Sequence, residues 1–140
     1  MKKFVLAITG ASGIIYGIRT FEELKKGGCR VYLTVSENAK KIMEHETSCD
    51  VKELIAGADK YFEENDIESG LASGSFGYDG AAIVPCSLKT MGAIASGYAN
   101  NLIARMALCS MKEGRKLILV PRETPLDLIS LENMVKLKKS

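Results

Sequence analysis

The sequence has no tryptophan, a single histidine and only three prolines among its 140 residues. Its four cysteines, Cys29, Cys49, Cys86 and Cys109, show no CxxC spacing. The single histidine adds only one further candidate ligand to these scattered cysteines, so the pattern argues against a zinc site. Scattered, unpaired cysteines are typical of reduced thiols inside the cell, and we predict a cytoplasmic protein without a metal.

Long apolar runs and a strong charge of either sign are also absent. No run reaches the roughly 18 apolar residues that a membrane span needs. The apolar start at 4–8 leads directly into a glycine motif, which favours a strand over a signal peptide. A net charge of +2 is too small to indicate a nucleic-acid partner. We therefore expect neither membrane nor nucleic acid as a partner.

Segments with strand and helix patterns alternate along the chain. We predict strands at 4–9, 30–35, 81–84 and 116–120, and helices at 14–26, 37–46, 51–58, 89–95, 101–113 and 126–138. A helix break is expected near 97–101, since Gly and Asn are weak helix formers. This alternation predicts a single α/β domain over 1–140, with a parallel sheet covered on both faces by helices.

Polar residues lie at the ends of all four predicted strands, at the edge where open parallel sheets bind ligands. The first motif is TGASG, Thr9 to Gly13, directly before a helix. Backbone N–H groups and the helix dipole attract phosphate there, although glycine also serves packing alone. The spacing matches neither a dinucleotide fingerprint nor a Walker loop. Ser36 follows the second strand, where it either caps the next helix or binds a ligand.

The second polar motif is PCSLKT, Pro85 to Thr90, which joins a strand to a helix. Its hydroxyls and free N–H groups suit a phosphate or the polar edge of a flavin ring. Cys86 within it is interpreted as a small packing residue. Later, VPRETP places Arg122 and Glu123 in a proline-stiffened loop. Arg122 suits a phosphate, and a surface salt bridge is the alternative.

Together these segments resemble the UbiX-type flavin prenyltransferases, formerly described as aromatic acid decarboxylases. The matching stretches are TGASGIIYG, SENAKKIMEHET, LASGSF, the run from PCSLKT to NNLIAR, and MKEGRKLILVPRETPLDLISLENM. They cover nearly the whole chain. The resemblance implies a flavodoxin- or Rossmann-like three-layer fold and assembly into homo-oligomers, dodecamers in the family.

The resemblance also implies an activity. Family members join a dimethylallyl group from dimethylallyl monophosphate to N5 and C6 of reduced FMN without a metal. The prenylated FMN serves UbiD-type decarboxylases. Carried over by motif, the FMN contacts are Gly10, Ala11, Ser12, Ser36, Ser87, Leu88, Lys89, Thr90 and Arg122. The resemblance likewise implies that Arg105, Lys112 and Arg122 bind the donor phosphate. It implies that the catalytic residues are Ser12, Glu46, Lys112 and Glu123.

The chain departs from the family pattern after its LENM motif. Family chains continue there with a strand, a proline-rich loop ending in Tyr, and a C-terminal helix. We therefore expect a truncated homologue, in which activity depends on what the missing segment supplied. A non-catalytic FMN-binding protein is one alternative. A flavin-dependent cysteine decarboxylase is another, although its PASANT-like loop and catalytic histidine are absent. Direct decarboxylation of aromatic acids is the third.

Overall fold

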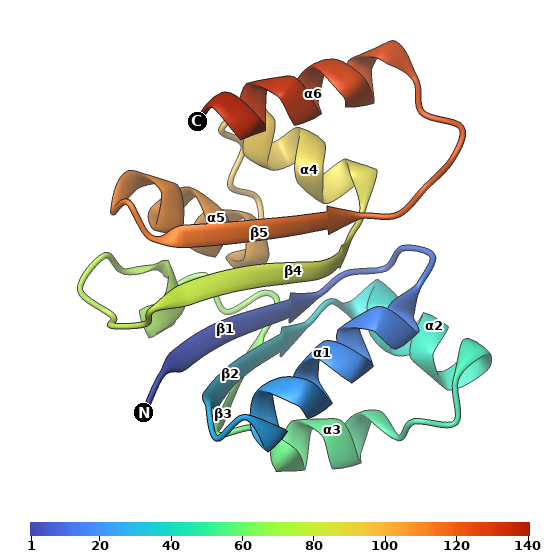
Figure 1. Cartoon of the computed structure of the whole chain (residues 1–140), viewed down its shortest axis with the longest axis vertical. Helices are drawn as coiled ribbons and strands as arrows, with labels where there is room; N and C mark the ends of the chain where they lie inside the picture. Colours follow the sequence, from blue (N-terminus) through green and yellow to red (C-terminus); the bar gives the residue numbers. More distant parts are fainter.

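The computed structural model describes residues 1–140 as alternating strands and helices (Figure 1). The strands are β1 (Lys3–Ile8), β2 (Arg30–Val35), β3 (Lys60–Glu63), β4 (Gly80–Cys86) and β5 (Lys116–Pro121). The helices are α1 (Ile14–Lys26), α2 (Glu37–Glu46), α3 (Val51–Gly57), α4 (Leu88–Ala95), α5 (Leu102–Lys112) and α6 (Leu128–Lys139), with a short 3₁₀ turn at Gly70–Ala72.

The five strands form one sheet in the order β3-β2-β1-β4-β5, and every neighbouring pair is parallel. The predicted parallel sheet is thus confirmed. From β1 the chain moves outward to β2 and β3, then returns to β4 and moves outward to β5. The direction of strand order therefore reverses between β1 and β4. In open α/β sheets, such a switch point opens a crevice at the carboxyl ends of the strands.

Both faces of the sheet are buried, as a central parallel strand requires. In β1, Val5 and Ala7 belong to a core cluster shared with α4 and α5. Leu6 and Ile8 belong to a second cluster shared with α1, α2 and α3. Successive side chains of a strand point to opposite faces, so one strand serves both cores. The three-layer flavodoxin-like arrangement predicted from the sequence is confirmed.

Glycines set two features of the chain path. A Cβ on Gly17 of α1 would overlap the backbone carbonyl of Val84, so only glycine allows α1 to lie this close to β4. Gly97 has φ +73 and follows the end of α4, where the chain turns before Asn101 caps α5. The predicted break in this region is confirmed, because the left-handed backbone at Gly97 cannot continue a helix.

One strand of the sheet, β3, was not predicted from the sequence. β3 is four residues long, and its sequence KYFE begins and ends with charged residues. It pairs only with β2 and forms an edge of the sheet. Its partner therefore decides its conformation, since four residues with charges at both ends give little periodicity. The other predicted strands and helices are present, with bounds that differ by at most three residues.

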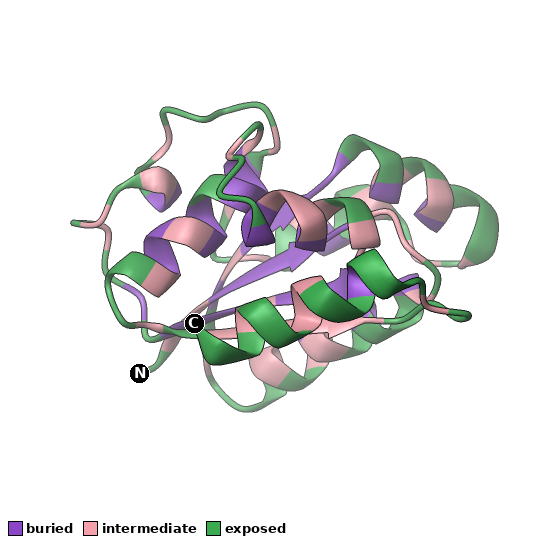
Figure 2. Cartoon of the chain, turned by 90° about the horizontal axis from the view of Figure 1, so that it is seen from above, coloured by how far each residue is buried: buried purple, intermediate pink, exposed green.

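The opposite edge of the sheet is β5, and α6 follows it and lies against α4. Much of α6 is exposed (Figure 2), including Leu128, Ile129 and Val135. None of the helices combines the length and apolar character needed to cross a bilayer.

Candidate functional site

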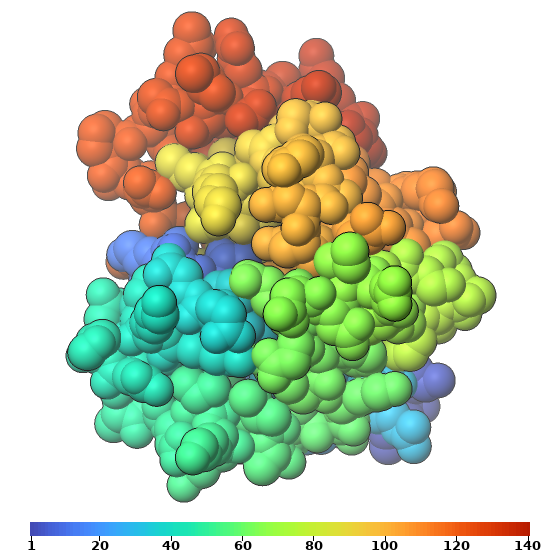
Figure 3. Space-filling view, turned by 180° about the vertical axis from the view of Figure 1, so that it is seen from behind, coloured from blue at the N-terminus to red at the C-terminus, as the bar shows by residue number.

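A cavity of about 580 Å³ lies over the carboxyl ends of β1 to β4, at the switch point of the sheet. In Figure 3 the surface is hollowed between the cyan atoms of α2 and the yellow atoms of α4. Pockets for cofactors commonly have volumes of about 300–1,000 Å³. Most of the lining is polar and comprises Thr9, Gly10, Ser36, Asn38, Glu64, Ser87, Lys89, Thr90, Gly92, Ala93, Ser96, Tyr98, Asn100, Asn101 and Ala104.

Three helices begin at this cavity, and a side chain caps each one. The Ser36 hydroxyl accepts a hydrogen bond from the Ala39 N–H at 3.0 Å, at the start of α2. Ser87 accepts from the Thr90 N–H at 3.1 Å, at the start of α4. The Asn101 side-chain amide oxygen accepts from the Ala104 N–H at 2.9 Å, at the start of α5. Helix N-termini carry partial positive charge, so their convergence favours an anionic group.

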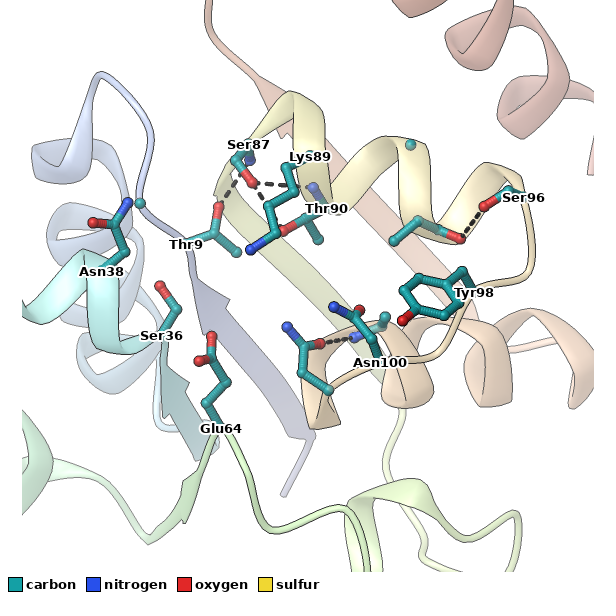
Figure 4. A pocket seen from close by; sticks show the side chains of 15 residues that line it. Thr9, Ser36, Asn38, Glu64, Ser87, Lys89, Thr90, Ser96, Tyr98 and Asn100 are labelled. Carbon is teal, nitrogen blue, oxygen red and sulfur yellow. Dashed lines mark hydrogen bonds between the residues drawn. The ribbon is translucent and has the colours of Figure 1, made fainter.

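Two side chains of opposite charge face each other in the cavity. Lys89 extends from the first turn of α4, and Glu64 follows β3 on the other side (Figure 4). The Glu64 backbone carbonyl accepts a hydrogen bond from the Leu102 N–H at 2.9 Å, which ties the end of β3 to the start of α5. Lys89 can hold a phosphate, whereas the Glu64 carboxylate can accept hydrogen bonds from hydroxyl groups.

The first loop also reaches residues outside the cavity lining. The Arg122 guanidinium donates to the Ser12 hydroxyl at 2.9 Å and lies 5.1 Å from the ring centre of Tyr16. Gly13 has φ +92, and a Cβ there would lie 2.7 Å from Cδ of Arg122. Glycine is therefore needed at this position for both its backbone angle and the approach of Arg122. The loops after β1 and β5 thus meet beside the cavity.

The predicted site residues divide into three groups. Gly10, Ser36, Ser87, Lys89 and Thr90 line the cavity, while Ala11 and Leu88 lie next to lining residues in the chain. Ser12 and Arg122 form the contact described above, and Glu123 is exposed beside Arg122. The structure does not bring Glu46, Arg105 and Lys112 to the lining.

Glu46 and Lys112 are the last residues of their helices. Glu46 is ten residues beyond Ser36, about 15 Å along the axis of α2 at 1.5 Å per residue. Lys112 is eight residues beyond Ala104, about 12 Å along α5. Arg105 is in the first turn of α5, next to Ala104, but it is exposed. Within one chain, Glu46 and Lys112 are therefore separated from the polar cavity.

Cys86 is not suited to act as a nucleophile. Its side chain is buried in the core cluster around α4 and α5. Burial raises the pKa of the Cys86 thiol to about 12, so the thiol stays protonated at neutral pH. This agrees with its interpretation as a packing residue. The four cysteines are all free, and no group of three or more His, Cys, Asp or Glu residues is arranged to hold a metal ion.

Sequence reasoning named Thr9 in the TGASG motif without assigning it a cofactor contact, and it missed other lining residues, among them Asn38, Glu64 and Tyr98. Thr9 directly precedes the predicted Gly10, and Asn38 lies two residues after the predicted Ser36. Their positions in the sequence could therefore have indicated that they line the site. A Cβ on Gly10 would overlap the Asn38 side chain, which shows how closely those two loops pack. Glu64 gave no signal, because the strand that positions it was not predicted.

The flavoprotein family model matches residues 1–140. The chain is 50% identical over 135 residues to the flavin prenyltransferase UbiX of Methanocaldococcus jannaschii, covering 96% of this chain and 73% of that relative. The chain belongs to the UbiX flavin prenyltransferase family. The resemblance noted from its motifs is therefore confirmed.

Solved structures of UbiX proteins share this fold closely. AnUbiX in complex with FMN and dimethylallyl pyrophosphate has a TM-score of 0.96 and 39% identity, over 99% of this chain and 73% of that chain. A dodecameric FMN-dependent UbiX-like decarboxylase from Escherichia coli O157:H7 has a TM-score of 0.95 and 40% identity, over 98% of this chain and 75% of that one. The flavin prenyltransferase fold is thus shared over almost the entire chain.

Proposed function

We propose that this chain binds FMN in the polar cavity and transfers a dimethylallyl group from dimethylallyl monophosphate to N5 and C6 of the reduced flavin. The observation that carries this proposal is the convergence of three capped helix N-termini on one cavity. The peptide groups there suit a phosphate, and the many hydroxyl and amide side chains suit a ribityl chain and a flavin edge. Membership of the UbiX family supports the same activity.

The residues of the cavity fit FMN by their chemistry. Gly10 offers its backbone N–H in the first loop, and Ser36 offers its hydroxyl at the end of β2. Ser87, Lys89 and Thr90 offer hydroxyls and a cation at the start of α4. When bound and reduced, the flavin supplies the nucleophilic atoms to which the dimethylallyl group is joined.

The remaining predicted residues have roles that the chemistry requires. Arg122 and Arg105 stabilise the negative charge of the departing phosphate, because cations lower the energy of a leaving anion in a water-poor site. Glu46 and Glu123 are the proposed carboxylates for proton transfer. Glu123 follows Arg122, the partner of Ser12, whereas Glu46, at the far end of α2, would reach the reaction only from a neighbouring copy of the chain. The hydrogen bond from Arg122 to Ser12 supports a common role for these two side chains.

We also propose that the chain works as a homo-oligomer. Exposed apolar side chains on α6 and α1, among them Leu128, Ile129, Ile15 and Tyr16, are surfaces that association would cover. An oligomer also gives Lys112 a role: at the far end of α5, it would serve the cavity of a neighbouring copy. The dodecameric E. coli protein supports this assembly.

The proposed recipient of the prenylated flavin is a UbiD-type decarboxylase, and the proposed location is the cytoplasm. The four free cysteines support a reducing compartment.

The test is to incubate the chain anaerobically with reduced FMN and dimethylallyl monophosphate, and to measure the mass of the released flavin. We expect a flavin heavier by one dimethylallyl unit. Lys89→Ala should abolish most of this product, whereas Lys52→Ala, at an exposed position of α3 outside the cavity lining, should not. Unmodified FMN that co-elutes with the protein would instead identify a flavin-binding protein without transferase activity. Failure to bind FMN at all would refute the proposal.

A further inference from the structure

The Thr9 side chain is almost completely buried, with 2% of its surface exposed. It follows the last residue of β1, at the edge of the cavity. Its hydroxyl donates a hydrogen bond to the Pro85 carbonyl at 2.7 Å and accepts one from the Ser87 N–H at 2.8 Å. One hydroxyl therefore holds the residues on both sides of Cys86, 76 and 78 positions away in the sequence.

These two bonds lie where the backbone ladder between β1 and β4 ends. The paired residues run from Phe4 with Gly80 to Ala7 with Ile83. Pro85 has no N–H group and cannot donate to a neighbouring strand. Beyond Ile83, the Thr9 N–H also donates to the Pro85 carbonyl, at 3.3 Å. The side chain of Thr9 thus continues the connection between the two strands across their switch point.

The connection extends from Thr9 into the start of α4. Ser87, held by Thr9, caps α4 through the Thr90 N–H and donates its hydroxyl proton to the Thr90 hydroxyl at 2.9 Å. Both Ser87 and Thr90 line the cavity (Figure 4). A shift of the Ser87 backbone would move both hydroxyls and the N-terminus of α4 relative to the loop at Gly10.

We propose that Thr9 is a positioning residue of the flavin site, whose hydroxyl sets the distance between the first loop and the N-terminus of α4. This rests on the proposed binding of FMN. Without the hydroxyl, the Ser87 N–H loses its acceptor and the Pro85 carbonyl loses a donor in a buried place, which is costly enough to shift the turn. Flavin affinity therefore depends on an oxygen at position 9, even though Thr9 acts through Ser87.

The test compares Thr9→Val, which replaces the hydroxyl by a methyl group of similar size, with Thr9→Ser, which keeps the hydroxyl. Thr34→Val is the matched control. Thr34 is also a fully buried threonine, on the neighbouring strand β2, but its hydroxyl has no hydrogen-bond partner. For each protein, FMN affinity is measured by quenching of flavin fluorescence, and stability by urea unfolding without FMN.

We expect Thr9→Val to weaken FMN binding about tenfold or more, consistent with the loss of a buried hydrogen-bond partner. Thr9→Ser should stay within about threefold of the parent, and Thr34→Val should bind as the parent does. Equal losses in Thr9→Val and Thr9→Ser would assign the effect to methyl packing and overturn the proposal. So would a Thr9→Val protein that is less stable but binds FMN normally.

A second measurement keeps the proposal testable if Thr9→Val does not fold. Amide hydrogen exchange reports whether the Ser87 N–H is protected in the parent and in Thr9→Ser. We expect protection in both proteins, and exchange at the rate of an exposed loop would contradict the proposal. If the parent protein itself does not bind FMN, the proposed function fails, while protection of the Ser87 amide still tests the Thr9 contact separately.

Discussion

The loops on the two sides of the flavin site are held in different ways. The turn after β4 is fixed by two hydrogen bonds to the hydroxyl of the buried Thr9, and the turn after β2 by the buried cap Ser36. The loop after β5 is exposed over Arg122 to Pro125 and meets the first loop through Arg122 and Ser12. One side is therefore preorganised for the cofactor, while the other can adjust to a second substrate or a neighbouring subunit.

The largest effect is expected from Ser87→Ala, which breaks the preorganised side. The variant loses the cap of α4 and a hydroxyl in the cavity. We expect stability to fall by about 1 kcal/mol, typical of a lost N-cap. FMN affinity should fall about 10- to 100-fold if the hydroxyl binds a charged phosphate. Urea unfolding and fluorescence titration measure the two effects.

The matched control is Asp127→Ala, which removes the cap of α6 at 2.6 Å from the Ser130 N–H. It should lower the melting temperature by about 2–5 °C without weakening FMN binding. If both variants weakened FMN binding equally, the cap of α4 would have no special relation to the cofactor.

A smaller effect on the fold is expected from Arg122→Ala, on the adjustable side. Arg122 is exposed, and its contact with Ser12 is open to solvent. Stability should change by no more than about 0.5 kcal/mol, as for most surface substitutions. FMN affinity should fall less than in Ser87→Ala, while dimethylallyl transfer should fall more than binding. An FMN loss as large as that of Ser87→Ala would show that both sides are equally preorganised.

The smallest effect is expected on stability at low pH. The hydrogen bond from the Ser130 backbone N–H holds the pKa of the Asp127 carboxyl below its usual value. A depressed pKa contributes stability that is present above about pH 4 and is lost as the pH falls through the folded-state value. Asp127→Asn keeps a capping side chain that does not titrate. The parent should therefore lose its advantage over Asp127→Asn as the pH falls below about 4, measured by urea unfolding. A constant difference across this range would contradict the assignment.

The sequence predicted the preorganised side better than the rest. TGASG and PCSLKT are continuous motifs, so their glycines, hydroxyls and helix starts can be recognised locally. The contact of Arg122 with Ser12 joins residues 110 positions apart and depends on the strand order. Glu64 depended on β3, whose four residues become a strand only beside β2. The placement of Glu46 and Lys112 depends on helix direction and on assembly, which no local pattern specifies.

The three helix N-termini at the cavity have a consequence for the conditions under which the protein can hold a phosphate. Their attraction comes from peptide dipoles, which carry no proton that can be gained or lost near neutral pH. Changes of acidity around the protein alter the ligand's own charge, but leave this part of the site unchanged. The same attraction depends on where the helices start, and therefore on the capping side chains of Ser36, Ser87 and Asn101.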